Sequence, residues 1–328
     1  DILGGSTGTF NWGKCTWSGK FEFNFDNGKK TTLKNTCLRH TLSNKSVRLS
    51  AQVEPPSVEN VIVRGSSTGA FLAISNSASA GSMKNLWLDC NADGGGNPVN
   101  CANSSNLYAE KLVLTNYLNG TGSVSAFTNR SAIIATSGNG TFYDVYNFIP
   151  QQTLFFNSNA SNCIADNINF QFGCREDISG QVLVGAIRLI NCNNNVITNV
   201  TQIKVGPIYP YGLAVTCGSG SSNNTIDGVV LKSGASGSGN DRWDNVANDQ
   251  GFRNRYNNFT MYGYYKDTHI VTGSASLGAS LSNFYCVEKQ SETNADFRVG
   301  ARVRAEQIYL NNTQNPGNGN FAPIAVAS

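Results

Sequence analysis

The stretch NCNNNVITNVTQIKV, residues 191–205, sets a run of asparagines directly against residues that favour β-strands. Asn193, Asn194 and Asn195 interrupt regular structure, because the Asn side chain competes for nearby backbone hydrogen bonds. Val196 and Ile197 follow at once, and β-branched side chains favour the extended conformation. The stretch therefore predicts strands that meet at corners built from asparagine.

The composition is that of an ordered, weakly charged protein. Of the 328 residues, 40% are hydrophobic and 14% are charged, against about 25% charged in an average protein, which excludes a disordered chain. No apolar run approaches the ~20 residues of a membrane helix. The start, DILGGSTGTF, has neither the basic nor the apolar region of a signal peptide. The net charge is +3 and the basic residues are scattered, so we expect no membrane insertion and no nucleic-acid partner.

The nine cysteines are interpreted as buried thiols rather than as metal ligands. Their number is odd, no Cys-x-x-Cys pair occurs, and the chain has only two histidines, His40 and His269. A zinc site needs clustered Cys and His ligands, so we expect no metal and no cofactor. Free cysteines usually pack as small apolar residues, and we expect structural roles for both histidines.

A short pattern recurs along most of the chain. It consists of an apolar residue, any residue, then Asn or another polar residue or Gly, then apolar, any and apolar. Ten copies occur, for example VENVIV at 58–63, IDGVVL at 226–231 and LSNFYC at 281–286, and successive copies lie 23 to 33 residues apart. Their central apolar residues are Val61, Leu86, Leu112, Val145, Ile168, Val200, Val229, Phe259, Phe284 and Ile308.

This period predicts a β-solenoid. A repeat of about 20–50 residues indicates a solenoid, a propeller or an array. The apolar spacing of two excludes helical repeats, and a propeller blade needs about 40 residues. Each coil then stacks on the next at about 4.8 Å, with parallel strands and inward columns of apolar residues. The Asn, Asp or Gly of the pattern marks a corner in the left-handed conformation, and stacked asparagines can hydrogen-bond along the ladder.

The pattern resembles the right-handed parallel β-helix of pectate-lyase-like proteins over roughly residues 58–310. The resemblance implies an all-β, right-handed parallel β-helix of about ten or more coils, which we place at residues 51–310. Residues 1–50 lack the repeat, and the stretch 19–33 is typical of a hairpin with a turn at Asn27–Gly28. We expect residues 1–50 to cap the first coil, since an open apolar end favours aggregation, and residues 311–328 to form a C-terminal tail.

Insertions between coils are expected to carry the function, because the coils themselves are generic. Three long spacings follow one another, at 171–191, 206–222 and 232–255, and we expect them to form one wall. Hydrolysis of a glycosidic bond needs two carboxyl groups about 5–9.5 Å apart, and aromatic rings offer a flat apolar face to sugars. The candidate catalytic residues are Glu176, Asp177, Asp241 and Asp244, and the candidate substrate-binding residues are Arg175, Tyr209, Tyr211, Arg242, Trp243 and Arg253.

Ordinary structural roles compete with each of these assignments. Acidic residues in such segments are typical of solvated turns, and the aromatic residues could pack on their own loops. A second aromatic surface is expected at MYGYYKDT, residues 261–268. It could extend a sugar-binding groove or contact another subunit.

The catalytic motifs of known pectinases do not occur. The Asn-Thr-Asp, Asp-Asp and Gly-His-Gly signatures of polygalacturonases are missing, as are the Arg-x-Pro-x-x-Arg element of pectate lyases and the Asp-Pro-His motif of alginate epimerases. A β-helix without these motifs resembles the polysaccharide depolymerases of bacteriophage tailspikes and tail fibres. That resemblance implies a homotrimer in the virion tail, outside the cell, which binds and cleaves bacterial capsule or O-antigen polysaccharide as an endoglycosidase.

Two other functions stay open at this point. The chain could be a secreted microbial polysaccharide lyase, in which Arg175, Arg242 and Tyr211 neutralise a uronate and abstract its proton. It could also be a non-enzymatic receptor-binding or structural β-helix of a tail fibre or adhesin, in which Trp243 and the tyrosines bind glycan. The mass of the assembly separates a monomeric lyase from a trimer, and amide replacements of the acids separate a binder from an enzyme.

Overall fold

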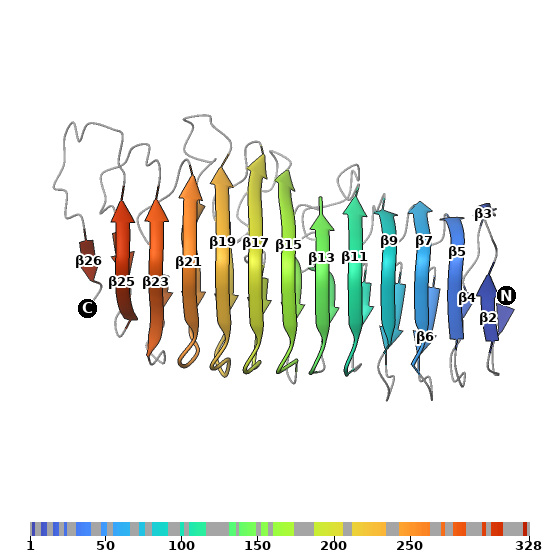
Figure 1. Cartoon of the computed structure of the whole chain (residues 1–328), viewed down its shortest axis with the longest axis horizontal. Helices are drawn as coiled ribbons and strands as arrows, with labels where there is room; N and C mark the ends of the chain where they lie inside the picture. Colours follow the sequence, from blue (N-terminus) through green and yellow to red (C-terminus); the bar gives the residue numbers. More distant parts are fainter. Residues whose placement is uncertain are drawn as a thin grey trace. The chain divides into compact units, whose positions relative to one another are not determined.

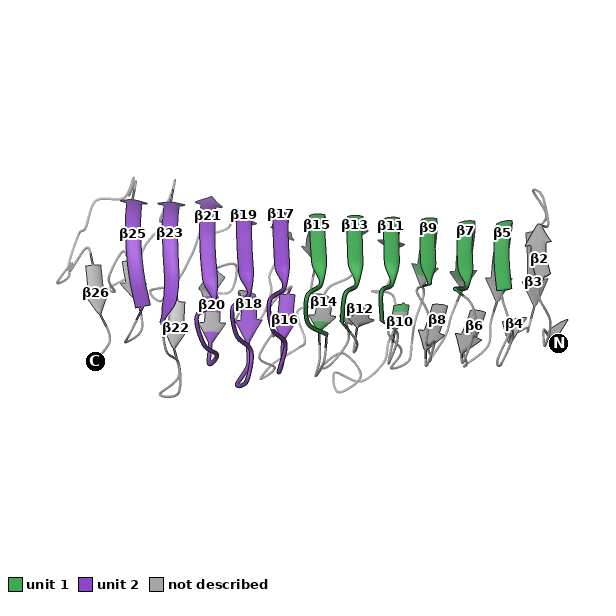
Figure 2. Cartoon of the chain, turned by 60° about the horizontal axis from the view of Figure 1, so that its bottom comes forward, with its two compact units in different colours: residues 1–168 green, residues 169–328 purple. Residues whose placement is uncertain are grey.

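The described part of the chain is built from β-strands in two units, residues 1–168 (unit 1) and residues 169–328 (unit 2), coloured separately in Figure 2. No α-helix occurs among the described residues. The computed structural model describes residues 2–3, 8–11, 16–19, 23–24, 31–40, 47–50, 55–65, 72–75, 81–90, 99–101, 105–115, 131–135, 138–148, 152–156, 160–173, 187–205, 212–233, 243–262, 270–272, 278–286, 297–299, 303–310 and 324–326.

Unit 1 consists of two parallel sheets whose strands alternate along the chain (Figure 1). The short-strand sheet contains β1 (Ile2–Leu3), β4 (Phe23–Asn24), β6 (Val47–Ser50), β8 (Leu72–Ser75), β10 (Val99–Cys101), β12 (Ser131–Ala135) and β14 (Gln152–Phe156). The long-strand sheet contains β2 (Gly8–Asn11), β5 (Thr31–His40), β7 (Ser57–Gly65), β9 (Ser82–Cys90), β11 (Tyr108–Thr115), β13 (Thr141–Asn147) and β15 (Ile164–Gly173), with β3 (Thr16–Gly19) beside β5.

Unit 2 repeats the same alternation. Its short-strand sheet contains β16 (Ile187–Leu189), β18 (Gly212–Cys217), β20 (Trp243–Asp249), β22 (Ile270–Thr272), β24 (Phe297–Val299) and β26 (Ile324–Val326). Its long-strand sheet contains β17 (Val196–Val205), β19 (Thr225–Ser233), β21 (Arg255–Tyr262), β23 (Ala279–Cys286) and β25 (Val303–Leu310).

The strand pairing shows that the chain is a parallel β-solenoid. In unit 1 the register places Val61 opposite Leu86 and Leu86 opposite Leu112. In unit 2 it places Val200 opposite Val229, and the same ladder continues through β21, β23 and β25. Equivalent residues of successive sequence repeats therefore lie directly beside one another, which confirms the fold class predicted from the repeat.

The coils turn at the polar position of the repeat, as the sequence predicted. In all ten copies this residue has a positive φ, between 53° and 68°, which is the left-handed region that Asn, Asp and Gly tolerate best. A second left-handed corner, for example Asn194 or Asn223, precedes the long strand. The residues at the repeat corner are Asn60, Asn85, Lys111, Asp144, Asn167, Asn199, Gly228, Asn258, Asn283 and Gln307.

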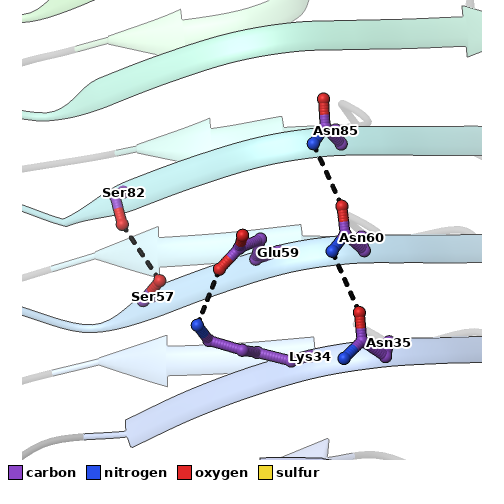
Figure 3. Close-up of polar contacts among 7 residues, drawn as sticks. All are labelled: Lys34, Asn35, Ser57, Glu59, Asn60, Ser82 and Asn85. Atoms are coloured by element: carbon purple, nitrogen blue, oxygen red, sulfur yellow. Dashed lines mark hydrogen bonds and ion pairs between the residues drawn. The ribbon is translucent and has the colours of Figure 1, made fainter. Parts of the chain in front are cut away.

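Asparagines at these corners also stack on one another, as expected. Asn60 Nδ2 donates to Asn35 Oδ1 at 2.9 Å, and Asn85 Nδ2 donates to Asn60 Oδ1 at 3.0 Å (Figure 3). Beside this ladder Lys34 forms an ion pair with Glu59 at 2.7 Å. The corner amides thus tie each coil to the next in addition to the backbone ladder.

Inward columns of apolar residues form the core. Of the ten predicted central residues, all are buried except Ile308, which is partly exposed. Each fully buried aliphatic or aromatic side chain stabilises the fold by about 1.5–3 kcal/mol. Stacking the coils is therefore the main source of stability, as in other solenoids.

One inward column of unit 2 is polar. Asn195, Asn224 and Asn254 follow the second corner on successive coils, and all three are completely buried. Asn224 Oδ1 accepts from Asn195 Nδ2 at 2.9 Å, and Asn254 Oδ1 accepts from Asn224 Nδ2 at 2.9 Å. The asparagine run of the opening stretch thus supplies both a corner, Asn194, and a buried ladder, Asn195.

The repeat begins earlier than the sequence predicted. The long strand β5 carries an eleventh copy, LKNTCL at 33–38, with Asn35 at a φ of 54°. This copy is hidden in the sequence because Thr36, which is buried, takes the central apolar position. The hairpin predicted at 19–33 is wrong, because β4 pairs with β6 in one sheet and β5 pairs with β7 in the other. The capping role of residues 1–50 stays a prediction.

The three long spacings are not simple insertions. Each contains a strand of the short-strand sheet, β16, β18 and β20 respectively. These strands carry no corner asparagine that would mark them in the sequence. The remaining parts, residues 174–186, 206–211 and 234–242, lie outside the described residues.

Among the cysteines whose burial the structure describes, Cys101, Cys163, Cys192 and Cys217 are buried thiols, as predicted. Burial raises the pKa of Cys163 to about 11. It also raises the pKa of Cys101 and of Cys217, and Cys192 is buried as well. Cys37 is a free thiol that is partly exposed.

Candidate functional site

Most of the predicted site residues lie outside the described part of the chain. This applies to Arg175, Glu176, Asp177, Tyr209, Tyr211, Asp241 and Arg242. Trp243 and Asp244 begin the strand β20, so they do not lie in the loop in which the sequence placed them. Their roles, and the predicted wall of three loops, stay predictions.

Arg253 is the predicted binding residue whose surroundings the structure describes. It occupies the left-handed corner before β21, with a φ of 52°, where the preceding coils have Asn194 and Asn223. Its guanidinium carbon lies 4.6 Å from the ring centroid of Phe252, and both side chains are exposed. A flat ring and a cation are thus held together at the surface of unit 2.

The outward side of β21 continues from this corner. All four of its non-buried residues other than Asn258 point away from the core, but the strand turns at Asn258, so Arg255 and Asn257 lie before this turn and Thr260 and Tyr262 lie after it. Arg255 is exposed, and its register partners, Thr225 on one side and Ser280 on the other, are short. The Arg255 side chain is therefore longer than the two side chains beside it on the neighbouring strands.

Exposed tyrosines lie after the repeat corner on three successive strands, and we call Tyr262, Tyr285 and Tyr309 the tyrosine stripe. Their exposed fractions are 41%, 43% and 58%. Tyr262 lies two residues beyond Thr260, the register partner of Tyr285. Tyr285 and Tyr309 are register partners with ring centroids 6.3 Å apart. Tyr262 pairs with Lys232, whose ammonium lies 5.8 Å from the ring centroid. Tyr262 also confirms one exposed aromatic residue in the predicted surface 261–268; residues 263–268 lie outside the described part.

The charges on the side of the coil before the repeat corner are unevenly compensated. Arg304 forms an ion pair with Glu306, and Asp227 Oδ1 accepts a hydrogen bond from Asn258 at 2.6 Å. Among the described residues, neither Arg253 nor Arg255 forms an ion pair with a carboxylate. The corner end of β21 is therefore locally cationic.

Unit 1 has a different arrangement on its long-strand sheet. Arg64 Nε lies 2.9 Å from Asp89 Oδ2, and its guanidinium lies 5.2 Å from the ring centroid of Trp87. Trp87 Nε1 donates to Thr115 Oγ1 at 2.8 Å, and Thr115 donates to Asp89 Oδ1 at 2.9 Å. These contacts link β7, β9 and β11, which suits a role in tying the coils together.

A carboxylate inside unit 2 is unsuited to act on a polymer. Asp249 is completely buried, and it accepts hydrogen bonds from Gly251 N–H at 2.7 Å, Asn254 Nδ2 at 3.1 Å and the Tyr256 hydroxyl at 3.1 Å. Burial raises the pKa of Asp249 above its usual range, and the three hydrogen bonds oppose the shift. The Tyr256 hydroxyl also lies 3.3 Å from Cys217 Sγ. This is a polar part of the core.

Within the described ranges, no cluster of His, Cys, Asp and Glu residues suits a metal ion. The same part of the chain contains no helix long and apolar enough to cross a bilayer.

Sequence reasoning missed Arg255 and two members of the tyrosine stripe. Tyr285 and Tyr309 directly follow the central apolar residue in LSNFYC and AEQIYL, a position whose side chain points outward. Stacking the ten repeats in register would have placed the two tyrosines in one outward column. We instead expected the site in the long spacings between copies of the repeat and not on the regular coils.

No protein-family description matches the sequence, and no curated protein matches it. Among solved structures, the chain is similar to a GH136 lacto-N-biosidase from Eubacterium ramulus, with a TM-score of 0.39 and 12% identity over 90% of this chain and 51% of that one. It is also similar to the A-module of the mannuronan C-5 epimerase AlgE6 of Azotobacter vinelandii, with a TM-score of 0.34 and 11% identity over 98% of this chain and 90% of that one. The chain thus spans about half the length of the first structure. At this level of similarity neither match bears on the site.

Proposed function

We propose that the chain is an extracellular polysaccharide-binding β-solenoid whose unit 2 holds a bacterial capsule or O-antigen chain against the tyrosine stripe. The observation that carries this proposal is the register pair of exposed tyrosines Tyr285 and Tyr309, with a third exposed tyrosine, Tyr262, on the preceding strand two residues beyond the register partner of Tyr285. Each ring offers an apolar face to a sugar and a hydroxyl to hydrogen-bond its substituents.

The geometry of the stripe favours an extended polymer over a compact ligand. Successive strands of a sheet lie about 4.8 Å apart, so a linear chain that crosses β25 and β23 meets Tyr309 and then Tyr285, and a chain that continues obliquely to β21 meets Tyr262. The register partner of Tyr285 on β21 is Thr260, whose short polar side chain leaves that ring accessible. Large apolar groups that stay exposed side by side are typical of binding surfaces.

The finer part of the proposal is that the protein is a tailspike-like depolymerase. In it a right-handed helix of ten or more coils assembles as a homotrimer in the virion tail. A pair of carboxylates cleaves the glycosidic bond, and the candidates for this pair are Glu176, Asp177, Asp241 and Asp244. In sequence, Glu176 and Asp177 lie between β15 and β16, Asp241 lies just before β20, and Asp244 lies at its start.

A non-enzymatic binding protein is the second candidate, and the state of the described carboxylates of unit 2 favours it. Glu306 is paired with Arg304, Asp227 is held by Asn258, and Asp249 is buried. Asp249 is enclosed in the core, and the other two each contact a neighbouring side chain at the surface. A purely binding role needs only the stripe.

A panel of bacterial capsules and O-antigens tests the proposal. Retention of a polysaccharide by the immobilised chain is measured together with new reducing ends and unsaturated-uronate absorbance. Retention with new reducing ends alone indicates a hydrolase, and both chemical signals indicate a lyase. Retention without either chemical signal supports a binding protein and contradicts the catalytic role. Failure to retain any member of the panel would overturn the proposed function.

If cleavage is seen, amide replacements identify its acids. Glu176→Gln, Asp177→Asn, Asp241→Asn and Asp244→Asn are compared one at a time for cleavage and for retention. An acid of the active site loses cleavage and keeps retention. Equal cleavage in all four variants would remove these residues from the mechanism.

A further inference from the structure

We infer that the polysaccharide held by unit 2 is acidic, and that Arg253 and Arg255 bind its carboxylate groups. This inference rests on the proposed function and adds the chemical class of the ligand. Both guanidinium groups are exposed at the N-terminal end of β21, before the corner at Asn258, and Tyr262 of the stripe lies on the same strand after that corner.

Arg253 is held in a conformation suited to binding an anion. Its backbone is fixed at a left-handed corner, and its guanidinium lies 4.6 Å from the Phe252 ring centroid. The side chain runs along Gly278 of the next coil, where a Cβ atom would lie only 3.7 Å from Arg253 Cγ. A side chain ordered before binding loses less conformational entropy when the ligand arrives.

Arg255 adds a second donor group two residues further along the chain. Its register partners Thr225 and Ser280 are uncharged and short. A guanidinium presents a planar fork of donors that matches a carboxylate with two parallel hydrogen bonds. A uronic acid lying across Phe252 places a carboxylate within the reach of such groups, whereas a neutral sugar leaves two like charges uncompensated.

The contrast with Arg304 shows that cationic character is local to this corner. Through Ser280, Arg304 occupies the same outward column as Arg255. It is, however, paired with Glu306, at 2.6 Å from Arg304 Nε to Glu306 Oε1. Arg64 in unit 1 is likewise paired, with Asp89. Arg253 and Arg255 differ from both, because no described carboxylate neutralises them.

The substitutions that test this inference are taken from neighbouring coils. Arg253→Asn places at the corner the residue that Asn223 provides one coil earlier, and Arg255→Thr copies the register partner Thr225. Arg304→Ser, which copies Ser280, is the matched control. These changes keep residues that the same fold already accepts at those positions.

The experiment measures the dissociation constants of polygalacturonate, alginate and uronate-containing capsules, each before and after reduction of its carboxyl groups to alcohols. We expect binding of at least one acidic polymer that weakens about tenfold on reduction. For the same polymer we expect each arginine substitution to weaken binding about tenfold, the order of one charge-assisted hydrogen bond. The salt dependence of binding then falls in the double variant, and Arg304→Ser leaves the constant unchanged.

The results that would contradict this inference differ from those that would contradict the proposed function. Equal affinity for acidic and reduced polymers, or unchanged binding by the double variant, overturns the inference and leaves the proposed function standing. Absence of binding to every acidic, reduced and neutral polymer overturns both.

Discussion

Replacement of Asn224 by alanine is predicted to destabilise unit 2 strongly, because this side chain lies in the middle of the buried asparagine ladder. Asn224 Oδ1 accepts from Asn195 N–H at 3.0 Å and from Asn195 Nδ2 at 2.9 Å. Its Nδ2 donates to Cys192 O at 3.0 Å and to Asn254 Oδ1 at 2.9 Å. The substitution removes all four hydrogen bonds from a site with no exposed surface.

The magnitude follows from that count. A hydrogen bond inside a protein contributes about 0.5–1.5 kcal/mol net, so four of them give a loss of about 2–6 kcal/mol in the free energy of unfolding. The cavity left by the amide adds to the loss in the same direction. A change of this size is well above that of an ordinary surface substitution, which stays within about 0.5 kcal/mol.

Guanidinium unfolding followed by far-ultraviolet circular dichroism measures the effect, with Asn223→Gly as the control. Asn223 is the adjacent, exposed corner residue with a φ of 55°, and glycine adopts that conformation without strain. We expect a clear loss for Asn224→Ala and little change for Asn223→Gly. A loss below about 1 kcal/mol for Asn224→Ala, or equal effects of the two changes, would refute the structural role of the buried ladder.

Three further predictions follow from the core of the solenoid. The folded-state pKa of Asp249 is raised above its unfolded value by burial, so its contribution to stability is fully present below the unfolded pKa and is lost as pH rises through the folded pKa. The stability of Asp249→Asn relative to wild type, measured by thermal unfolding, should therefore increase as pH rises above about 4. A difference that stays constant with pH would contradict this. Gly251→Ala should lower the free energy of unfolding by several kcal/mol, because a Cβ atom there would lie 2.0 Å from Ser221 O. Gly218→Ala should have a small effect, because its Cβ atom would have its nearest contact at 3.4 Å. Comparable midpoints of denaturant unfolding for the two variants would argue against this packing. The buried thiols Cys101, Cys163, Cys192 and Cys217 should react with a thiol reagent only after unfolding, and mass spectrometry that finds them labelled in the native protein would contradict their burial.

The repeat made the architecture predictable to the level of single residues. Its polar position is a left-handed corner in every copy, including Lys111 and Gln307, which are not typical corner residues. The apolar positions fill the core because register is fixed by the side-chain period of two. The copy in β5 was not predicted because a buried threonine takes the place of its central apolar residue. The strands of the short-strand sheet were not predicted because, as far as the structure describes them, they contain no corner asparagine.

The candidate site was much less predictable than the fold. Acids such as Asp249 look equivalent to catalytic acids in the sequence, but Asp249 is enclosed by the coil and hydrogen-bonded to Tyr256 and Asn254. Whether a residue points outward depends on its position in the coil, which long spacings obscure. The tyrosine stripe and Arg255 required the register of the strands, since Tyr285 and Tyr309 are neighbours only across the sheet.

Polysaccharide binding by a stripe variant tests the central claim most directly. Tyr285→Thr and Tyr309→Thr are combined, because Thr260 is the register partner of Tyr285 one coil earlier. Tyr146→Val, which copies Val113 in unit 1, is the control for loss of an exposed tyrosine. Calorimetric titration with a polysaccharide that the wild type retains should show binding weakened at least about tenfold in the double variant, on the order of 1 kcal/mol per ring, and unchanged in the control. Wild-type affinity in the double variant would contradict the account.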